Sequence, residues 1–190
     1  MSMSKIKEIA ENIARIIRVR GCRLIAIDGR CASGKTVLSA ELENILDCNV
    51  IHMDHFFLRS EQRTPERLST PGENVDHERF LTEVLIPLKN KAKSNYRPFD
   101  CKTMSFGKEI ELDREKITVI EGSYSCHNAL YDYYDLHIFM DVSAEEQMKR
   151  IELREGKFKV KLFESKWIPL EESYFSKFGI SDKCEFYFKT

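Results

Sequence analysis

Apolar side chains near the start of the chain recur at helical spacing. Ile6, Ile9 and Ile13 lie three or four residues apart, and charged residues stand between them. Positions at that spacing share one face of a helix. The pattern therefore predicts an amphipathic helix over residues 4–20, ended by Gly21.

Five short apolar runs rich in β-branched and aromatic residues predict strands, and helix-like segments separate most of them. The runs are residues 22–28, 49–53, 117–121, 136–141 and 184–188. Nearly continuous apolar strands that alternate with helices are typical of a parallel sheet covered on both faces. We predict a single domain over residues 1–190, with a doubly wound α/β fold and a five-stranded parallel sheet.

Two segments depart from this alternation. Residues 96–114 alternate partly between apolar and polar positions around Phe106-Gly107, which predicts an antiparallel β-hairpin that projects from the sheet. Residues 58–75 contain two prolines and a glycine among charged side chains. They are predicted to form a long surface loop, and loops of that length usually have a functional reason.

The composition excludes several functional classes. The chain has 190 residues and a net charge of −1, so it is long enough for one core and lacks the basic excess of a nucleic-acid binder. No apolar run approaches the ~20 residues of a membrane span. Charged side chains interrupt the first helix, unlike the core of a signal peptide. We expect a cytoplasmic protein without nucleic-acid or membrane partners, and a homo-oligomer is compatible with the sequence.

Cysteine and histidine spacing gives little support for a metal centre. The six cysteines are spread widely, and no two of them form a C-x-x-C pair. His52 and His55 lie close to Asp54, but this loose cluster lacks further ligands at metal-binding spacing. We favour ordinary polar packing for these histidines over a metal site.

One stretch carries a specific chemical pattern. Residues 29–36 read GRCASGKT and fit G-x-x-x-x-G-K-[ST], with a predicted strand before them and a predicted helix after them. Backbone N–H groups of such a loop converge on phosphate oxygens, and the helix adds the positive end of its dipole. We expect the loop to bind ATP through Gly29, Arg30, Cys31, Ala32, Ser33, Gly34, Lys35 and Thr36. Lys35 would contact the β and γ phosphates, and the Thr36 hydroxyl would bind Mg²⁺.

Three acidic residues are candidates for the chemistry beside that loop. Asp54 follows the second predicted strand, Glu121 ends the third, and Asp76 opens the helix after the long loop. The carboxyl ends of strands in an open α/β sheet face one crevice, so Asp54 and Glu121 should meet there. Phosphoryl transfer needs a carboxylate that accepts the proton of the acceptor hydroxyl. Asp76 would bind the substrate, cap its helix, or do both.

Two arginines suggest a cationic lid. Arg150 and Arg154 are four residues apart on a predicted helix, so they share one face of it. On a lid over residues 150–162 they would close over the nucleotide and neutralise phosphate charge. A solvated basic helix face explains the same spacing equally well.

Several separated motifs together resemble the uridine kinase and phosphoribulokinase family of P-loop kinases, from about Arg23 to the C-terminus. "DGRCASGKT" is similar to the family's phosphate loop, "MDHFF" to its Asp-x-Phe-Tyr/Phe motif, "NVDHERF" to its Asn-Phe-Asp-His-Pro segment and "VIEG" to its strand-end Glu-Gly. The resemblance implies that Asp54 is the catalytic base and that Asp76 binds sugar hydroxyls of the acceptor. It also implies a Mg²⁺ site among Thr36, Glu121 and Asp54, with the two arginines in the lid.

The hairpin departs from the family pattern. Uridine kinases carry a Tyr-Asp-Phe segment there, followed by a histidine that reads the pyrimidine base. This chain has Phe99-Asp100-Cys101, with Met104 where the histidine would fall. A thioether cannot reproduce the directed hydrogen bonds of an imidazole. Tyr96 or Phe99 would stack on a substrate ring or pack the hairpin itself.

The leading hypothesis is an ATP- and Mg²⁺-dependent kinase acting on a hydroxyl of a uridine- or cytidine-like nucleoside or a similar small metabolite. Asp54, Lys35, Arg150 and Arg154 would be its catalytic residues. The same architecture serves pantothenate and nicotinamide riboside kinases, so a non-pyrimidine acceptor is the first alternative. A nucleotide-hydrolysing switch or binding protein is the second, although the chain lacks the Asn-Lys-x-Asp guanine motif.

Overall fold

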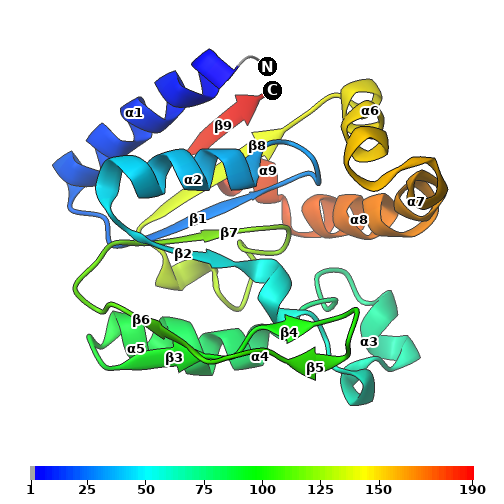
Figure 1. Ribbon diagram of the computed structural model, residues 1–190, viewed down its shortest axis with the longest axis horizontal. Coiled ribbons are helices and arrows are strands. Elements are labelled where there is room, and N and C mark those ends of the chain that lie inside the picture. Colours follow the sequence, from blue (N-terminus) through cyan, green and yellow to red (C-terminus); the bar gives the residue numbers. More distant parts are fainter. Residues whose placement is uncertain (1–2) are drawn as a thin grey trace.

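Five parallel strands form the central sheet, in the order β2-β7-β1-β8-β9. The computed structural model describes residues 3–190 (Figure 1). The strands are β1 (Leu24–Gly29), β2 (Asn49–His52), β7 (Thr118–Glu121), β8 (Leu136–Asp141) and β9 (Phe186–Lys189). Each begins and ends within two residues of its predicted range. The predicted five-stranded parallel sheet is confirmed.

Helices α1 (Met3–Arg20) and α2 (Lys35–Leu46) cover one face of the sheet (Figure 1). Ile9 and Ile13 of α1 pack with Ile25 and Ile27 of β1 in one buried cluster. These are the apolar positions from which the first helix was predicted. The helix ends at Gly21, where the backbone turns to a φ of +67°.

The opposite face carries a second core. Leu24 and Ala26 of β1 point into it, because successive side chains of a strand alternate between faces. It is covered by α4 (His77–Phe80), the π-helical turn Leu81–Leu85, α5 (Ile86–Lys89), α8 (Ile168–Phe178) and α9 (Ile180–Lys183). A short 3₁₀ turn, Tyr131–Tyr133, precedes β8. With helices on both faces, the sheet is doubly wound as predicted.

The predicted surface loop over residues 58–75 is partly helical, which corrects that prediction. It contains the 3₁₀ turn Ser60–Gln62 and the helix α3 (Pro65–Ser69). Thr64 caps α3 by accepting a hydrogen bond from the Arg67 backbone N–H at 3.2 Å, and proline is favoured in the first helical turn. A bridge between Phe57 and Val75 brings the ends of the segment together.

The antiparallel hairpin is confirmed, and it consists of two short ladders. Strand β3 (Ser94–Tyr96) pairs with β6 (Ile110–Leu112), and β4 (Phe99–Asp100) pairs with β5 (Ser105–Phe106). The turn lies at residues 101–104. None of these strands pairs with the central sheet among the described residues.

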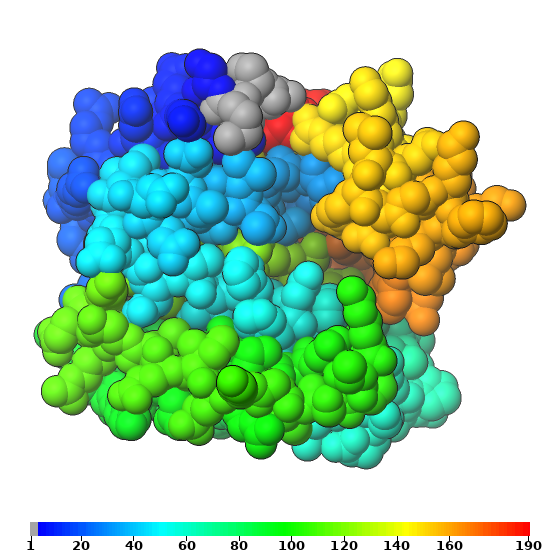
Figure 2. Space-filling model, in the orientation of Figure 1, coloured from blue at the N-terminus to red at the C-terminus, as the bar shows by residue number. Residues whose placement is uncertain are grey.

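A helical segment follows β8 on the far side of the phosphate loop. It consists of α6 (Ala144–Glu155) and α7 (Lys157–Leu162), joined at Gly156, and it continues through the π-helical turn Phe163–Trp167 into α8. Figure 2 shows this yellow and orange segment standing out from the face, with a hollow between it and the cyan and green segments. Within residues 3–190, no helix is both long and apolar enough to cross a membrane.

Candidate active site

The phosphate loop joins the carboxyl end of β1 to the start of α2, as its motif requires. Gly29 has a φ of +135°, and a Cβ atom on it would lie 2.0 Å from the backbone oxygen of Met140 in β8. Only glycine fits so close to the neighbouring strand. Gly34 begins the turn into α2 with a φ of +99°. The sequence thus places the loop where backbone N–H groups and a helix N-terminus can meet an anion.

Lys35 and Thr36 lie at the start of α2, and both side chains turn back toward the strand ends. The buried Lys35 ammonium donates hydrogen bonds to the backbone oxygens of Gly29 at 2.6 Å and Arg30 at 2.9 Å. The Thr36 hydroxyl donates to Glu121 Oε1 at 3.1 Å. A hydroxyl and a carboxylate this close are the hard oxygen ligands that Mg²⁺ prefers, so these residues fit the ion.

Glu121 links the phosphate loop to the end of β2. It is buried at the end of β7, and its Oε1 lies 2.6 Å from His52 Nδ1. This hydrogen bond raises the pKa of His52 above its ordinary value, since the carboxylate favours the protonated imidazole. The carboxyl ends of β2, β7 and β1 therefore converge at one place, as the sequence predicted.

Asp54 lies in the 3₁₀ turn Met53–Phe56 that follows β2. Its side chain remains accessible to solvent, while protein crowds it on other sides. That partial desolvation, and next the negative charge of Glu121, raise the pKa of Asp54, whereas the charge of Lys35 opposes the shift. An accessible carboxylate with a raised pKa, beside a phosphate loop, has the properties of a general base.

Asp76 caps α4, as one of its two predicted roles required. Its Oδ1 accepts a hydrogen bond from the Arg79 backbone N–H at 3.2 Å. The residue is 2% exposed, and its Oδ2 has no hydrogen-bond partner in the described chain. Arg59 and Arg79 each place a guanidinium nitrogen 3.6 Å from that oxygen. Its role in acceptor binding stays a prediction.

Tyr96 packs at the inner ladder of the hairpin, and Phe99 packs in the ladder next to its turn. The Tyr96 ring lies 5.0 Å from that of Phe56, and its hydroxyl is 3.1 Å from His55 Nδ1. The Phe99 ring meets that of Phe106 at 5.4 Å. Both residues are buried, so contact with a substrate ring would require an opening of this packing, and their predicted substrate role remains untested.

The two arginines predicted to belong to a lid have different surroundings. Arg150 donates to the backbone oxygen of Ala32 in the phosphate loop at 3.1 Å and to Glu146 at 2.9 Å. Arg154 pairs with Glu155 at 3.1 Å, and its positive charge opposes the rise in the pKa of Asp54. Arg150 thus contacts the phosphate loop, whereas the charge of Arg154 favours the ionised form of Asp54. Their predicted contacts with nucleotide remain predictions.

Helix α8 supports the phosphate loop, which the sequence did not reveal. Glu171 accepts a hydrogen bond from the Cys31 backbone N–H at 2.9 Å and another from the Ser123 hydroxyl at 2.6 Å. Glu172 pairs with the Arg30 guanidinium, which also contacts Asp141. The side chain of Arg30 therefore helps to hold the phosphate loop against α8 and β8. The partners of Glu171 lie far away along the chain, and no local signal marks them.

Asp28 is a second residue whose role emerges only from the fold. Its carboxylate, fully buried at the end of β1, accepts hydrogen bonds from the backbone N–H groups of Gly29, Tyr124 and Cys126 and from the Tyr174 hydroxyl. It therefore ties together the phosphate loop, the loop after β7 and α8. In the sequence, the only indication of this role is that Asp28 is a charged residue at the end of an otherwise apolar strand.

The loose histidine cluster resolves into separate pairs. His52 contacts Glu121, and His55 contacts the Tyr96 hydroxyl. The two rings meet edge to face, with centroids 5.3 Å apart. Three possible metal ligands do come together elsewhere, at Glu73, His77 and His127, a group that the sequence did not indicate.

Comparison with protein-family models and with curated proteins found no match. Among solved structures, a protein of Bacillus stearothermophilus described as a possible uridine kinase superimposes with a TM-score of 0.72 at 16% identity. The match covers 97% of this chain and 99% of that one. The chain has a kinase-like P-loop fold. At that identity the likeness concerns the fold alone.

Two further structures are more distant. Shikimate kinase from Bacteroides thetaiotaomicron matches with a TM-score of 0.44 at 13% identity, over 88% of this chain and 86% of that one. Deoxyadenosine kinase from M. mycoides with bound dATP matches with a TM-score of 0.37 at 16% identity, over 88% and 89%. These scores are too low to support an argument about function.

Proposed function

We propose that this chain is an ATP- and Mg²⁺-dependent kinase that phosphorylates a hydroxyl group of a small metabolite, with a uridine- or cytidine-like nucleoside as the first candidate. The supporting observation is the convergence of Lys35, Thr36, Glu121 and Asp54 at the ends of three neighbouring strands. The structural likeness to a possible uridine kinase agrees with this proposal.

Each residue of the candidate site has a distinct role in the proposed phosphoryl transfer. The loop amides and Lys35 bind the phosphates, while Thr36 and Glu121 hold the Mg²⁺ ion, with Asp54 close by. Bound Mg²⁺ supplies positive charge that neutralises the phosphate oxygens. Asp54 orients the acceptor hydroxyl and takes its proton, and Asp76 holds the acceptor. Arg150 and Arg154 are the cations available to the transferred group.

A non-pyrimidine acceptor is the second candidate, and one observation favours it. Met104, which stands where the family's base-reading histidine would fall, lies in the hairpin turn and is 39% exposed. It offers no directed hydrogen bond to a pyrimidine. Pantothenate- and nicotinamide riboside-type acceptors therefore belong in any substrate screen.

Acceptor-dependent ADP release tests the proposal. We expect one class among nucleosides, pantothenate, nicotinamide riboside and sugar alcohols to accelerate ADP formation from Mg²⁺-ATP. Asp54→Asn should lower kcat by about 10²- to 10⁴-fold, because the general base is lost. Lys35→Ala should lower kcat/KM by at least about 10²-fold, because a phosphate-binding cation is lost.

Two control variants accompany the activity test. Asp132→Asn and Lys7→Ala change exposed residues outside the site and should leave turnover within about twofold. Circular dichroism would show that all four variants fold. ADP release that no acceptor accelerates would instead favour a nucleotide-hydrolysing switch, and full turnover in Asp54→Asn would remove Asp54 from its assigned role.

A further inference from the structure

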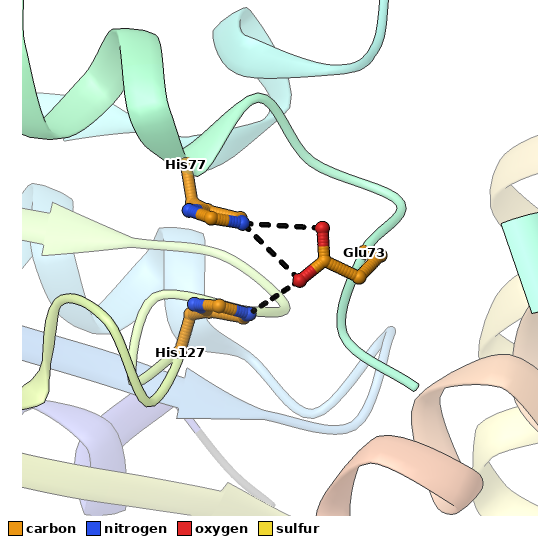
Figure 3. A group of neighbouring side chains, drawn as sticks. All are labelled: Glu73, His77 and His127. Carbon is orange, nitrogen blue, oxygen red and sulfur yellow. Dashed lines mark hydrogen bonds and ion pairs between the residues drawn. The ribbon is translucent and has the colours of Figure 1, made fainter. Parts of the chain in front are cut away.

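Glu73, His77 and His127 form a cluster outside the candidate active site (Figure 3). Glu73 lies in the loop before α4, His77 is the first residue of α4, and His127 lies in the loop after β7. Both imidazoles direct Nε2 at the same carboxylate. His77 Nε2 is 3.2 Å from each Glu73 oxygen, and His127 Nε2 is 3.7 Å from Oε1.

The two separations between Glu73 and the imidazoles match the edges of a tetrahedral metal site. Zinc binds imidazole nitrogen and carboxylate oxygen at ~2.0–2.2 Å, so two ligands at the tetrahedral angle lie ~3.3–3.5 Å apart. The observed values of 3.2 and 3.7 Å bracket that spacing. A charge-assisted hydrogen bond between a protonated imidazole and a carboxylate would be shorter, at ~2.7–2.9 Å. The spacing therefore accommodates a shared metal as well as a weak direct pair.

The surrounding packing holds the two rings in position. They stack with centroids 4.2 Å apart and an interplanar angle of 14°. The side chain of His127 is 6% exposed and that of His77 is 13% exposed, whereas Glu73 is more open at 27%. The backbone of Gly72 comes so close that a Cβ there would lie 3.0 Å from the His127 ring. The packing thus holds both histidines beside the carboxylate, with a more open side at Glu73. Because the lone pair of an imidazole nitrogen lies in the ring plane, one of the stacked rings must tilt for both Nε2 atoms to bind one ion.

We propose that Glu73, His77 and His127 bind a divalent transition metal of the zinc class, with the fourth position open to water. Two imidazole nitrogens and one carboxylate suit Zn²⁺ or Co²⁺, whereas Mg²⁺ and Ca²⁺ prefer oxygen ligands. The ion would join the loop that leads to Asp76 with the loop that follows Glu121. It would therefore brace the proposed acceptor side of the active site without taking part in phosphoryl transfer.

Two neighbours bear on the strength of this site. The Ala129 backbone N–H lies 3.2 Å from His127 Nδ1, and a metal at Nε2 would place the ring proton on Nδ1, so this contact must break. The contact is long, so little is lost with it. Arg67 lies 3.6 Å from a Glu73 oxygen but binds Glu78 more closely, at 2.6 Å. The Glu73 carboxylate thus remains available to an ion.

Metal titration of the full chain tests the proposal without any assay of phosphoryl transfer, so its outcome is independent of the proposed kinase function. The protein is purified with Cys101→Ser, which removes an exposed thiol, and is stripped of metal with a chelator. We expect one equivalent of Co²⁺ with visible absorption and no intense thiolate charge-transfer band, and displacement of Co²⁺ by Zn²⁺. Millimolar Mg²⁺ should not displace it.

Substitutions locate the ligands. Glu73→Gln, His77→Gln and His127→Gln should each weaken Zn²⁺ binding at least about 100-fold, because even indirect supporting residues contribute 10- to 100-fold to metal affinity. Glu66→Gln at an exposed position of α3, and His137→Gln at a histidine paired with Glu185, are the matched controls and should bind within about threefold of the parent.

Thermal unfolding gives a second readout. Zn²⁺ at about 100 times its Kd should raise the Tm of the parent and the controls by about 5–10 °C, because it binds only the folded chain. The three ligand variants should show no such rise. Absence of stoichiometric binding, a thiolate spectrum, or parent-like affinity in Glu73→Gln and both histidine variants would overturn the proposal.

Discussion

Asp28 shows how one buried side chain depends on opposing physical effects. Three backbone N–H groups and the Tyr174 hydroxyl donate to its carboxylate, and these bonds favour the ionised form. Complete burial acts in the other direction and dominates, so the pKa of Asp28 is raised to about 6. The stability of the chain should therefore depend on pH through this residue.

A pH series on Asp28→Asn tests that balance. Between about pH 4 and pH 6 the folded chain holds a proton on Asp28 that the unfolded chain has released, so Asp28 makes folding less favourable as the pH rises. The advantage of the parent over Asp28→Asn in unfolding free energy should shrink over this range, by up to about 3 kcal/mol. Urea unfolding of both proteins at each pH measures it. An advantage that grows with pH would mean that the donors outweigh burial.

At the residue scale, the sequence locates a side chain in the fold where the residue type and its local context define the position. The phosphate loop, Glu121 and Asp54 follow from a strand end, a glycine and a charged side chain within a few positions. Glu171 could not be found in this way, since its contact with Cys31 joins two distant parts of the chain. Nothing near Glu171 in the sequence distinguishes it from a surface carboxylate.

At the scale of elements, α8 acts as a support for the phosphate loop. Glu171→Ala would leave the Cys31 N–H without its acceptor and make the phosphate loop less ordered. The unsatisfied donor should cost about 1–2 kcal/mol of free energy. We expect the Kd for ATP to rise about 5- to 30-fold, as measured by calorimetry. Glu172→Ala is the control, because Arg30 keeps its contact with Asp141, and its Kd should change less than threefold. Equal effects would argue against a specific role for Glu171.

The junction between β7 and the turn after β2 depends on Gly122. Its φ is +141°, and an added Cβ would lie 2.7 Å from Met53 Cβ. Gly122→Ala should lower the free energy of unfolding by about 3 kcal/mol, through both steric clash and backbone strain. Gly21→Ala, at a φ of +67° with open space around it, should lower it by about 1 kcal/mol. Chemical denaturation measures both, and equal losses would contradict the steric part.

Elements were predicted with uneven success for a physical reason. Buried parallel strands are apolar throughout, so their ranges are visible in the sequence. The helix α3 has only five residues and buries none of them, so it lacks an apolar face that could reveal it. Thr64-Pro65, a cap residue followed by proline, was the one local pattern in the sequence that indicated the start of this helix. The hairpin was visible from alternation, but its two separate ladders were not.

For the whole molecule, the exposed segment over residues 150–162, predicted to be a lid, is the part that nucleotide binding should change most. Phe158 in α7 is 99% exposed, and Lys157, Lys159 and Lys161 lie around it on the surface. Trypsin should cut first in this segment. Mg²⁺ with a non-hydrolysable ATP analogue should slow the cleavage at least about threefold, because a closed lid opens locally less often.

Mass spectrometry of the fragments identifies the cleavage site. The analogue with chelator in place of Mg²⁺ is the control and should protect less, since Thr36 and Glu121 would then lack the ion they are proposed to share. An unchanged rate of tryptic cleavage in residues 150–162 in the presence of nucleotide and Mg²⁺ would contradict lid closure.

The overall fold was predictable because a parallel α/β sheet follows from local patterns. The position of the predicted lid depends on contacts that those patterns do not contain.

The support of the phosphate loop by α8 also has a consequence for biosynthesis. A ribosome delivers residues 29–36 early, yet Glu171 and Tyr174, which hold that region through Cys31 and Asp28, arrive more than 130 residues later. Contacts so distant along a nascent chain form late. The strand and helix around the motif therefore emerge well before the loop between them can reach its finished shape.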